Sequence, residues 1–349
     1  MPIRCGSTVA TKAYCGTNEI VRGYCGENLF FGSAPVAITA PLSFSSLSKT
    51  GSSISARQGA MVAGTKTTGI IFGGAHSSSY RNDFYRYVRS GANVALTALT
   101  RSGASISVRR YGGIVGNVGA GIIVGGHNPT ALNDAYRYAV AGSTVTLTAM
   151  TVAGTFPAQS VFSMVGDTSS GLIYGGLQTF PPNLNDFYRY VTSGDTITFT
   201  VLTKAGAAIT NRYGVSMVGD ATSGLFFGGR TGNGDRSDFY RYSIAGSTIT
   251  LTLLTKSGNS PPSMYGASIV GDKTSGIIFY GQAGSTQQSG VFRYVATDTA
   301  VNIRSVTKSG SSPNARSFMT AKGDTTSGIL FSGRAGSTTY SDFYSYSTS

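Results

Sequence analysis

The phrase Asn-Asp-Phe-Tyr-Arg-Tyr at residues 82–87 returns along the chain at a nearly constant interval. Its aspartate recurs at Asp83, Asp134, Asp186, Asp238 and Asp342, and Gly290 takes its place in one further copy. The first step is 51 residues long and each later step is 52. A period of this length is typical of proteins that copy one supersecondary unit around a ring or along a solenoid.

Two further phrases keep the same interval. A glycine that opens an apolar run ending in Gly-Gly occurs at Gly69, Gly121, Gly171 and Gly224, with weaker endings after Gly276 and Gly328. A phrase like Leu-Thr-Lys-Ser-Gly ends at Gly51, Gly103, Gly154, Gly206, Gly258 and Gly310. Short apolar runs that end in turn residues, without helical periodicity, predict β-strands. An apolar strand ending in Gly-Gly at this period predicts a β-propeller.

The fourth copy contains the four strands expected of one propeller blade. They are the apolar runs 212–218 and 224–229, the motif strand 238–243 and a strand at 248–255 in which Thr alternates with Ile and Leu. Inner strands that are apolar on both faces suit stacked blades, and the alternating strand suits the wet outer edge. The first turn carries Asp167, Asp220, Asp272, Asp324 or Asn117, which we interpret as Asx-turn residues rather than metal ligands.

The first three strands occur six times, but the last copy ends without a fourth strand. Residues 41–47 align with the missing strand, with Leu42, Phe44 and Leu47 at its apolar positions. Pro41 is acceptable there because the strand lies at an outer edge. We therefore expect an all-β fold of six blades over residues 36–349, in which an N-terminal strand closes the ring.

Residues 40–349 resemble the kelch repeat in the Gly-Gly after an apolar strand and the Tyr-x-Tyr that follows it. The resemblance implies a six-bladed kelch-like β-propeller. Kelch blades usually carry a Trp on the fourth strand, and this chain has none. We therefore expect packing between blades to rely on Tyr85, Tyr136, Tyr188, Tyr240 and their equivalents.

Residues 1–35 carry a smaller repeat of ten residues, marked by Cys5, Cys15 and Cys25. Short strands are predicted at 9–14, 20–24 and 29–31, joined at Gly-Thr-Asn and Gly-Glu-Asn. Three evenly spaced thiols without a fourth ligand make a poor zinc site, so we expect small buried hydrophobes and no metal. So little apolar mass hardly folds alone, and the segment is expected to dock on a partner or on copies of itself.

This N-terminal segment resembles the Tyr-Leu-Gly-type decapeptide repeats of tail proteins of tailed bacteriophages, with Cys in place of Leu. The resemblance implies a virion protein that binds other phage tail proteins through residues 1–35. No run is long enough to span a membrane and no signal peptide is evident, which predicts synthesis in the host cytoplasm. The odd cysteines all precede the main repeat, so no disulfide is expected in the body of the protein.

The net charge of +13 invites a nucleic-acid interpretation, but ten of the 27 positive residues sit at repeat-locked positions. Charges spread evenly around a wheel favour a solvated scaffold, so nucleic acid is not an expected partner. Catalysis and a cofactor are also not expected. Some kelch propellers are copper oxidases, but the body here has no Cys and only His76 and His127, and both glutamates of the chain lie before residue 36.

Comparing the six copies with one another separates two kinds of position. Residues that serve the scaffold recur in every copy, whereas residues that serve function need not recur. Loops after the second and fourth strands differ in every blade and emerge on one face, which we expect to bind the ligand. Arg57, Arg110, Arg212 and Arg316 head the inner strands, with Gln159 and Met264 in the other blades. They are expected either to ring the channel mouth or to serve the scaffold. The candidate binding residues are Arg57, His76, Tyr80, Arg81, Arg110, Tyr111, His127, Phe180, Arg212, Arg230, Arg236, Arg316, Arg334 and Tyr340.

These features favour a tail-fibre or tail-tip protein whose propeller recognises the host surface, most simply a glycan. The alternative is an intracellular or surface scaffold that binds a protein through the variable loops.

Overall fold

The structure is a computed structural model that describes residues 39–178 and 184–348 in full, together with strands at 12–15, 18–21, 24–25 and 28–29. The chain divides into an N-terminal segment, Met1–Ala37, and a main body, Ile38–Ser349. Every helix or strand element within the described residues is a β-strand. Among the described residues, no helix has the length and apolar character needed to cross a membrane.

The N-terminal segment contains two short hairpins. β1 (Lys12–Cys15) pairs antiparallel with β2 (Asn18–Val21), and β3 (Tyr24–Cys25) pairs antiparallel with β4 (Asn28–Leu29). Three strands were predicted and four are described: 9–14 corresponds to β1, 29–31 corresponds to β4, and 20–24 is divided between β2 and β3. The residues that join the two strands of each hairpin lie outside the described residues. The side chains of Cys5, Cys15 and Cys25 lie outside the described residues, so the absence of a metal there stays a prediction.

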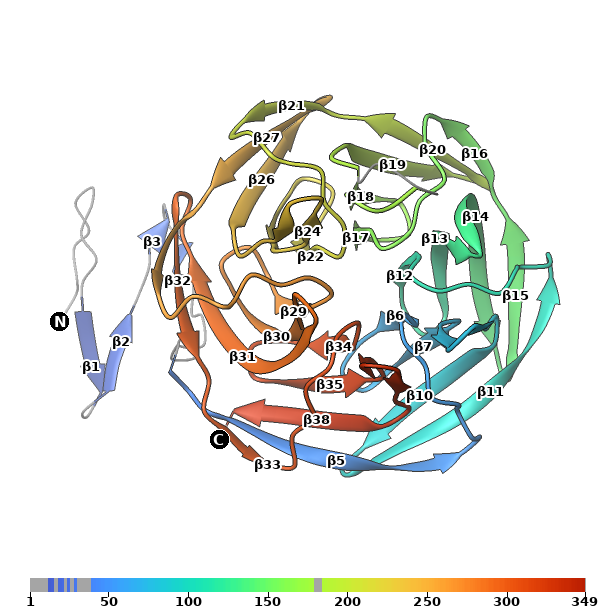
Figure 1. The fold of residues 1–349 in the computed structure, drawn as a ribbon, viewed down its shortest axis with the longest axis horizontal. Coiled ribbons are helices and arrows are strands. Elements are labelled where there is room, and N and C mark those ends of the chain that lie inside the picture. The colour runs from blue at the N-terminus through green and yellow to red at the C-terminus, as the bar shows by residue number, and fades with distance from the viewer. Residues whose placement is uncertain are drawn as a thin grey trace. The chain divides into compact units, whose positions relative to one another are not determined.

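The described part of the main body contains six antiparallel groups of four strands each, which follow one another around a common centre in Figure 1. Parallel pairing merges three of these groups and one further strand into a 13-stranded sheet, and it adds a fifth strand to each of the other three groups. We call the six groups repeats 1 to 6. Repeat 1 is β6 (Met61–Gly64), β7 (Thr68–Phe72), β10 (Phe84–Ser90) and β11 (Asn93–Gly103); repeat 2 is β12 (Gly113–Gly116), β13 (Ala120–Asn128), β14 (Thr130–Ala141) and β15 (Thr144–Ala149). Repeat 3 is β17 (Ser163–Gly166), β18 (Ser170–Tyr174), β19 (Phe187–Ser193) and β20 (Thr196–Val201); repeat 4 is β22 (Ser216–Gly219), β23 (Ser223–Phe227), β26 (Phe239–Ala245) and β27 (Thr248–Leu253). Repeat 5 is β29 (Ser268–Gly271), β30 (Ser275–Ala283), β31 (Thr286–Ala296) and β32 (Ala300–Ser305); repeat 6 is β34 (Thr320–Gly323), β35 (Ser327–Phe331), β38 (Phe343–Thr348) and β5 (Leu42–Gly51).

Repeat 6 is assembled from both ends of the main body. β5 pairs antiparallel with β38, placing Phe44 opposite Tyr346 and Leu47 opposite Phe343. Figure 1 shows the blue β5 lying along the red β38. The predicted pairing of the N-terminal strand with the C-terminal segment is therefore confirmed, although the strand runs from Leu42 to Gly51 rather than over 41–47.

The Leu-Thr-Lys-Ser-Gly-like phrase forms a connection that the sequence did not predict. After the fourth strand, the chain crosses to the next repeat and pairs parallel with its outer strand. The six junctions are β5–β11, β11–β15, β16 (Thr151–Gly154)–β20, β21 (Thr203–Gly206)–β27, β28 (Thr255–Gly258)–β32 and β33 (Lys308–Gly310)–β5. Each repeat is thus hydrogen-bonded to the next, and repeat 6 is bonded to repeat 1.

The glycine that ends this phrase is required by the close approach of the two chains. Gly51 has a φ of +79°, and a Cβ on it would lie 2.3 Å from the carbonyl oxygen of Leu96. A side chain would therefore clash with the partner strand as well as strain the backbone.

The motif strand explains why its sequence recurs. In repeat 1, Phe84 stacks on Phe72 with ring centroids 4.3 Å apart. The Arg86 guanidinium donates to the carbonyl of Gly142 in the next repeat at 2.9 Å. The Tyr87 hydroxyl donates to the carbonyl of Thr65 at 2.6 Å, and the equivalent tyrosine makes this bond in all six repeats. A Cβ on Gly69 would come within 2.7 Å of the Tyr87 ring, which explains the recurring glycine.

The first turns are Asx turns, as predicted. The Asp167 carboxylate accepts hydrogen bonds from the amides of Ser169 and Ser170 at 2.7 and 3.0 Å. Asp220, Asp272 and Asp324 repeat this arrangement, and the Asn117 side-chain oxygen does so without a charge. These carboxylates stabilise their own hairpins.

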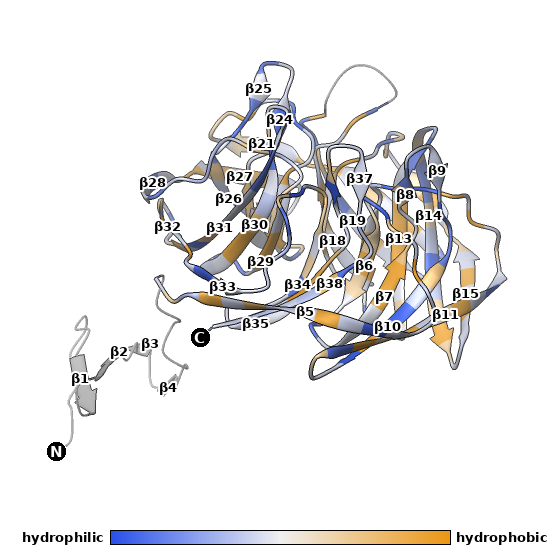
Figure 2. Cartoon of the chain, turned by 60° about the horizontal axis from the view of Figure 1, so that its bottom comes forward, coloured by the Kyte–Doolittle hydropathy of each residue, from blue (hydrophilic) through white to orange (hydrophobic). Residues whose placement is uncertain are grey.

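The core consists of apolar clusters between neighbouring repeats. One cluster joins Met61 and Phe72 of repeat 1 to Ile123 and Val145 of repeat 2. Another joins Phe331 of repeat 6 to the first strands of repeat 1. In Figure 2, hydrophobic residues concentrate on strands such as β7 and β13. Tyr188 and Tyr240 are buried in such clusters and bear out the expected tyrosine packing, whereas Tyr85 and Tyr136 are only partly buried.

Candidate functional site

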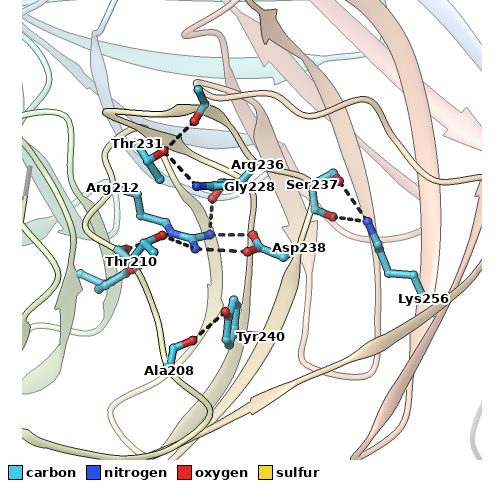
Figure 3. Close-up of polar contacts among 12 residues, drawn as sticks. Ala208, Thr210, Arg212, Gly228, Thr231, Arg236, Ser237, Asp238, Tyr240 and Lys256 are labelled. Carbon is cyan, nitrogen blue, oxygen red and sulfur yellow. Dashed lines mark hydrogen bonds and ion pairs between the residues drawn. The ribbon is translucent and has the colours of Figure 1, made fainter.

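Three of the candidate arginines are buried within their own repeats. Arg212 is 1% exposed, and its two Nη atoms donate to the two carboxylate oxygens of Asp238 at 2.6 and 3.1 Å. The same guanidinium donates to the carbonyls of Gly228 and Thr210 (Figure 3). Tyr240 lies beside it, with the guanidinium carbon 5.6 Å from the ring centroid.

Arg57 and Arg316 repeat this geometry with Asp83 and Asp342. They are 0% and 1% exposed, respectively. The expectation that Arg57, Arg212 and Arg316 form an open basic ring at the channel mouth is therefore wrong. The N–H groups of these three arginines are hydrogen-bonded within their own repeats. They therefore serve the scaffold, which was the alternative expectation.

The fourth arginine that is buried against an aspartate is Arg109, not Arg110. Arg109 is 0% exposed and binds both carboxylate oxygens of Asp134 at 2.6 and 2.7 Å. The sequence alignment placed Arg110 in register with Arg57, which is an error of one residue. Because neighbouring residues of an extended chain point in opposite directions, this shift turns Arg110 out of the sheet and towards the loop face.

At the centre of the loop face, the chain passes through six equivalent residues in the left-handed conformation. Their φ values are +62° at Gly59, +58° at Tyr111, +57° at Val161, +63° at Gly214, +61° at Gly266 and +54° at Phe318. Five hydrogen bonds of 2.8 or 2.9 Å run from the amide of one such residue to the carbonyl of the one before it. We call these six residues the hub. They line a central cavity of about 150 Å³.

An aromatic cluster covers the hub. The ring centroids of Tyr213 and Tyr265 are 5.6 Å apart, those of Tyr265 and Phe318 5.8 Å, and those of Phe318 and Tyr111 4.8 Å. The Tyr111 hydroxyl also donates to the side-chain oxygen of Gln58 at 2.8 Å. Of these aromatic residues, sequence reasoning identified only Tyr111. The available signal was the replacement of glycine by Tyr111, Val161 and Phe318 at one aligned position.

Three arginines lie on this cluster and define the mouth of the loop face. The guanidinium carbon of Arg110 is 4.9 Å from the Tyr111 ring centroid and 5.1 Å from that of Tyr80. Arg230 lies 5.2 Å from the ring of Tyr265, and Arg334 lies 5.4 Å from the ring of Phe318. All three are candidates from the sequence, and the structure brings them to the same cluster.

The mouth arginines differ from the buried ones in their partners. Arg230 has the carboxylate of Asp235 at 3.7 Å. Arg334 donates to the side-chain oxygen of Gln282 at 3.3 Å. Within the described residues, neither Arg110 nor Arg334 has a carboxylate within ion-pair distance. In the described part of the chain, no carboxylate neutralises the positive charges of Arg110 and Arg334, whereas aspartates neutralise those of Arg57, Arg109, Arg212 and Arg316.

The two histidines occupy different places. His127 approaches the Tyr80 hydroxyl through Nδ1 at 3.1 Å. Burial lowers the pKa of His127, and the charge of Arg110 lowers it further, so both favour the neutral imidazole. His76 is exposed and lies 2.6 Å from the Thr339 hydroxyl. In the part of the chain that the structure describes, no group of three or more His, Cys, Asp or Glu is arranged to hold a metal.

The remaining candidates that the structure describes are Tyr340, Arg236 and Arg81. The Tyr340 ring lies against the buried Arg316, 3.9 Å from its guanidinium carbon. Arg236 donates to the Thr231 hydroxyl at 3.3 Å, beside the hairpin of β24 (Arg230–Thr231) and β25 (Gly234–Asp235). Arg81 occupies the position equivalent to Arg236. The backbone carbonyl of each accepts a hydrogen bond from an amide of the next repeat, that of Arg109 or Met264 respectively. Phe180 lies outside the described residues.

No family model matches the chain, and no curated protein matches it either. Among solved structures, that of YjhT is similar, with a TM-score of 0.61 and 12% sequence identity over 83% of this chain and 94% of the other. At this identity the likeness bears on the fold alone. It agrees with the sheets seen here: the chain has an all-β, β-propeller-like fold.

Proposed function

We propose that the main body is a closed six-bladed kelch-like β-propeller. The six parallel junctions between repeats, together with the pairing of β5 and β38, support this arrangement. Closure by strands from both ends of the body leaves no sheet edge between repeats 6 and 1. A rigid ring of this kind presents its variable loops in a fixed geometry, which suits recognition.

We further propose that the loop face binds an acidic glycan of a host cell surface, as part of a phage tail. The observation that carries this proposal is the set of mouth arginines, which stack on aromatic rings and include two that have no acidic partner among the described residues. A stacked guanidinium keeps its N–H edges free, and those edges match the oxygens of a carboxylate in a bidentate way. Partial removal from water strengthens such contacts.

The phage context is supported by the decapeptide pattern of the N-terminal segment, which would attach the protein to other tail components. The proposed function is binding without catalysis. A single arginine contact contributes roughly 1.5–3 kcal/mol, so one site binds weakly and several copies on a particle would supply avidity.

The proposal is tested with three polymers that share a backbone: dextran, carboxymethyl-dextran and dextran sulfate. The protein should bind the charged polymers and not dextran, with an affinity that falls as salt rises. Arg110→Ala combined with Arg334→Ala should lower the affinity at least tenfold. Calorimetry measures the affinity, and binding of the variant to host cells provides the second measurement.

The matched control is Arg101→Ala combined with Arg304→Ala. Both residues are exposed on outer strands, and the pair removes the same net charge away from the mouth. If the control lost as much affinity as the mouth variant, the loss would reflect the overall charge of the protein and not the position of the arginines. Full binding by the mouth variant would place recognition elsewhere.

A further inference from the structure

We propose that Tyr111 and Phe318 are the specificity-determining residues of the mouth, and that they hold Arg110 and Arg334 for a compact oxyanion group, a carboxylate or a sulfate ester. This inference rests on the proposed function and names the part of the ligand that the hub recognises. It concerns positions that no repeat pattern requires to be aromatic.

The first observation is backbone strain at these positions. Three hub residues are glycine, for which a φ near +60° carries no steric penalty, whereas Tyr111 and Phe318 adopt φ values of +58° and +54°. Bulky residues are rarely found in this region of φ. Since Gly59, Gly214 and Gly266 make the same turn, the fold itself does not require a side chain there. Strain kept at a ligand-facing position points to function.

The second observation is that neighbouring glycines make room for the two rings. A Cβ on Gly59 would lie 2.4 Å from the ring of Tyr111, and a Cβ on Gly266 would lie 2.9 Å from the ring of Phe318. The hub therefore combines a strained aromatic residue with an unsubstituted neighbour at two places. Val161 shares the strain, with a φ of +57°, but offers no ring.

The third observation is the position of the arginines relative to these rings. Arg110 lies on Tyr111 and Arg334 lies on Phe318, and the two rings are in contact. Burial raises the pKa of Tyr111 to about 12, while the charges of Arg110 and Arg334 both oppose that rise. Both cations thus act on the same ring. The pair of rings brings together two arginines that come from repeats 2 and 6.

The size of the central cavity limits what enters it. Its volume of about 150 Å³ equals the space of roughly five water molecules at ~30 Å³ each. Pockets for larger ligands usually have about 300 Å³ or more. Neither Arg110 nor Arg334 lines this cavity, so a compact charged group on a sugar would meet the two arginines at its rim, and the sugar chain would lie across the mouth.

The test uses glycine, the residue that the other repeats carry. Tyr111→Gly, Phe318→Gly and the double variant remove the rings and relieve the strain, so the melting temperature should stay within about 3 °C of the parent protein. Their affinity for carboxymethyl-dextran or dextran sulfate should fall at least tenfold. Val161→Gly is the matched control, because it relieves the same strain without removing a ring, and it should bind as the parent does. Tyr111→Phe keeps the ring and should also retain binding.

The outcomes separate the two proposals. If the parent protein binds neither charged polymer, the proposed function fails and this inference fails with it. If the arginine variant loses binding but the double glycine variant keeps it, the inference alone is overturned. A steep fall in the melting temperature of the Tyr111→Gly or Phe318→Gly variant would mean that the rings stabilise the fold and do not determine specificity. A loss of affinity in Val161→Gly would mean that backbone geometry, not the rings, controls binding. Preference for one charged polymer identifies the group as carboxylate or sulfate.

Discussion

Repeats 1, 2, 4 and 6 bury an arginine against an aspartate, whereas repeats 3 and 5 do not, although all six have the same four strands. Repeat 5 has lost both partners, with Met264 and Gly290 at the two positions. Repeat 3 has lost only the arginine. Gln159 is there fully buried, and neither atom of its amide has a hydrogen-bond partner in the described part of the chain.

This difference shows how a buried ion pair constrains sequence. Removing one partner leaves an uncompensated charge, while replacing both by neutral residues is often tolerated. Repeat 5 follows the tolerated route. In repeat 3, Lys204 reaches the orphaned Asp186 at 3.0 Å, and Phe156 packs on Phe199 with ring centroids 4.2 Å apart. The pairs are therefore scaffold, and the proposed recognition is assigned to other arginines.

The largest expected effect comes from breaking a pair in a repeat that has one. Arg212→Ala should destabilise the protein by about 3–5 kcal/mol, because Asp238 would remain partly buried without its partner. Arg212→Met combined with Asp238→Gly copies repeat 5 and should cost clearly less than the single substitution. Denaturant unfolding measures both. A double variant as unstable as Arg212→Ala would show that packing, not charge compensation, distinguishes the repeats.

A smaller effect is expected from restoring the pair in repeat 3. Gln159→Arg should stabilise the protein by about 1 kcal/mol, because the new guanidinium would meet Asp186 and the orphaned amide would disappear. Met264→Arg is the matched control, since Gly290 offers no carboxylate, and it should destabilise. Thermal unfolding decides between them. Destabilisation by Gln159→Arg would mean that Phe156 already fills the space.

The smallest effect concerns the first turns, where Asp324 of repeat 6 has the uncharged counterpart Asn117 in repeat 2. Burial opposes ionisation of Asp324, but Lys66 at 2.9 Å and the Thr326 hydroxyl hold its pKa below the usual value. Because the folded pKa is the lower one, this carboxylate stabilises the fold above about pH 4, and the contribution is lost as pH falls further.

Asp324→Asn should accordingly cost less than about 1 kcal/mol at pH 7, since solvent screens the exposed Asp324–Lys66 pair. The variant should also lose less stability than the parent between pH 4 and pH 2. Urea unfolding across that range measures the difference. If the free energy of unfolding fell equally with pH in the two proteins, Asp324 would not contribute to the loss of stability in acid.

The periodic features could be predicted from the sequence because each repeats a local rule. The four strands, the Asx turns and the pairing of residues 42–47 with the last strand follow from apolar alternation and turn residues. The parallel junctions were missed, because a Thr-Lys-Ser-Gly run has no apolar alternation and owes its structure to a neighbouring strand. The site was predicted only in part: Arg110, Tyr111, Tyr80, Arg230 and Arg334 meet at the mouth, but Tyr213, Tyr265 and Phe318 were not recognised.

The sequence by itself determined the repeat, the strand order and the pairing of the N-terminal strand with the last strand, since these depend on period and on residue type. Only the tertiary structure decided which arginine of the pair 109–110 is buried. Arg109 and Arg110 have the same side chain, and neighbouring side chains of an extended chain point in opposite directions, so a shift of one residue decides which of the two is buried. Tertiary structure also decided that three hub residues with side chains share the turn of three glycines, because the five hydrogen bonds between successive hub residues join glycine and non-glycine positions in the same conformation.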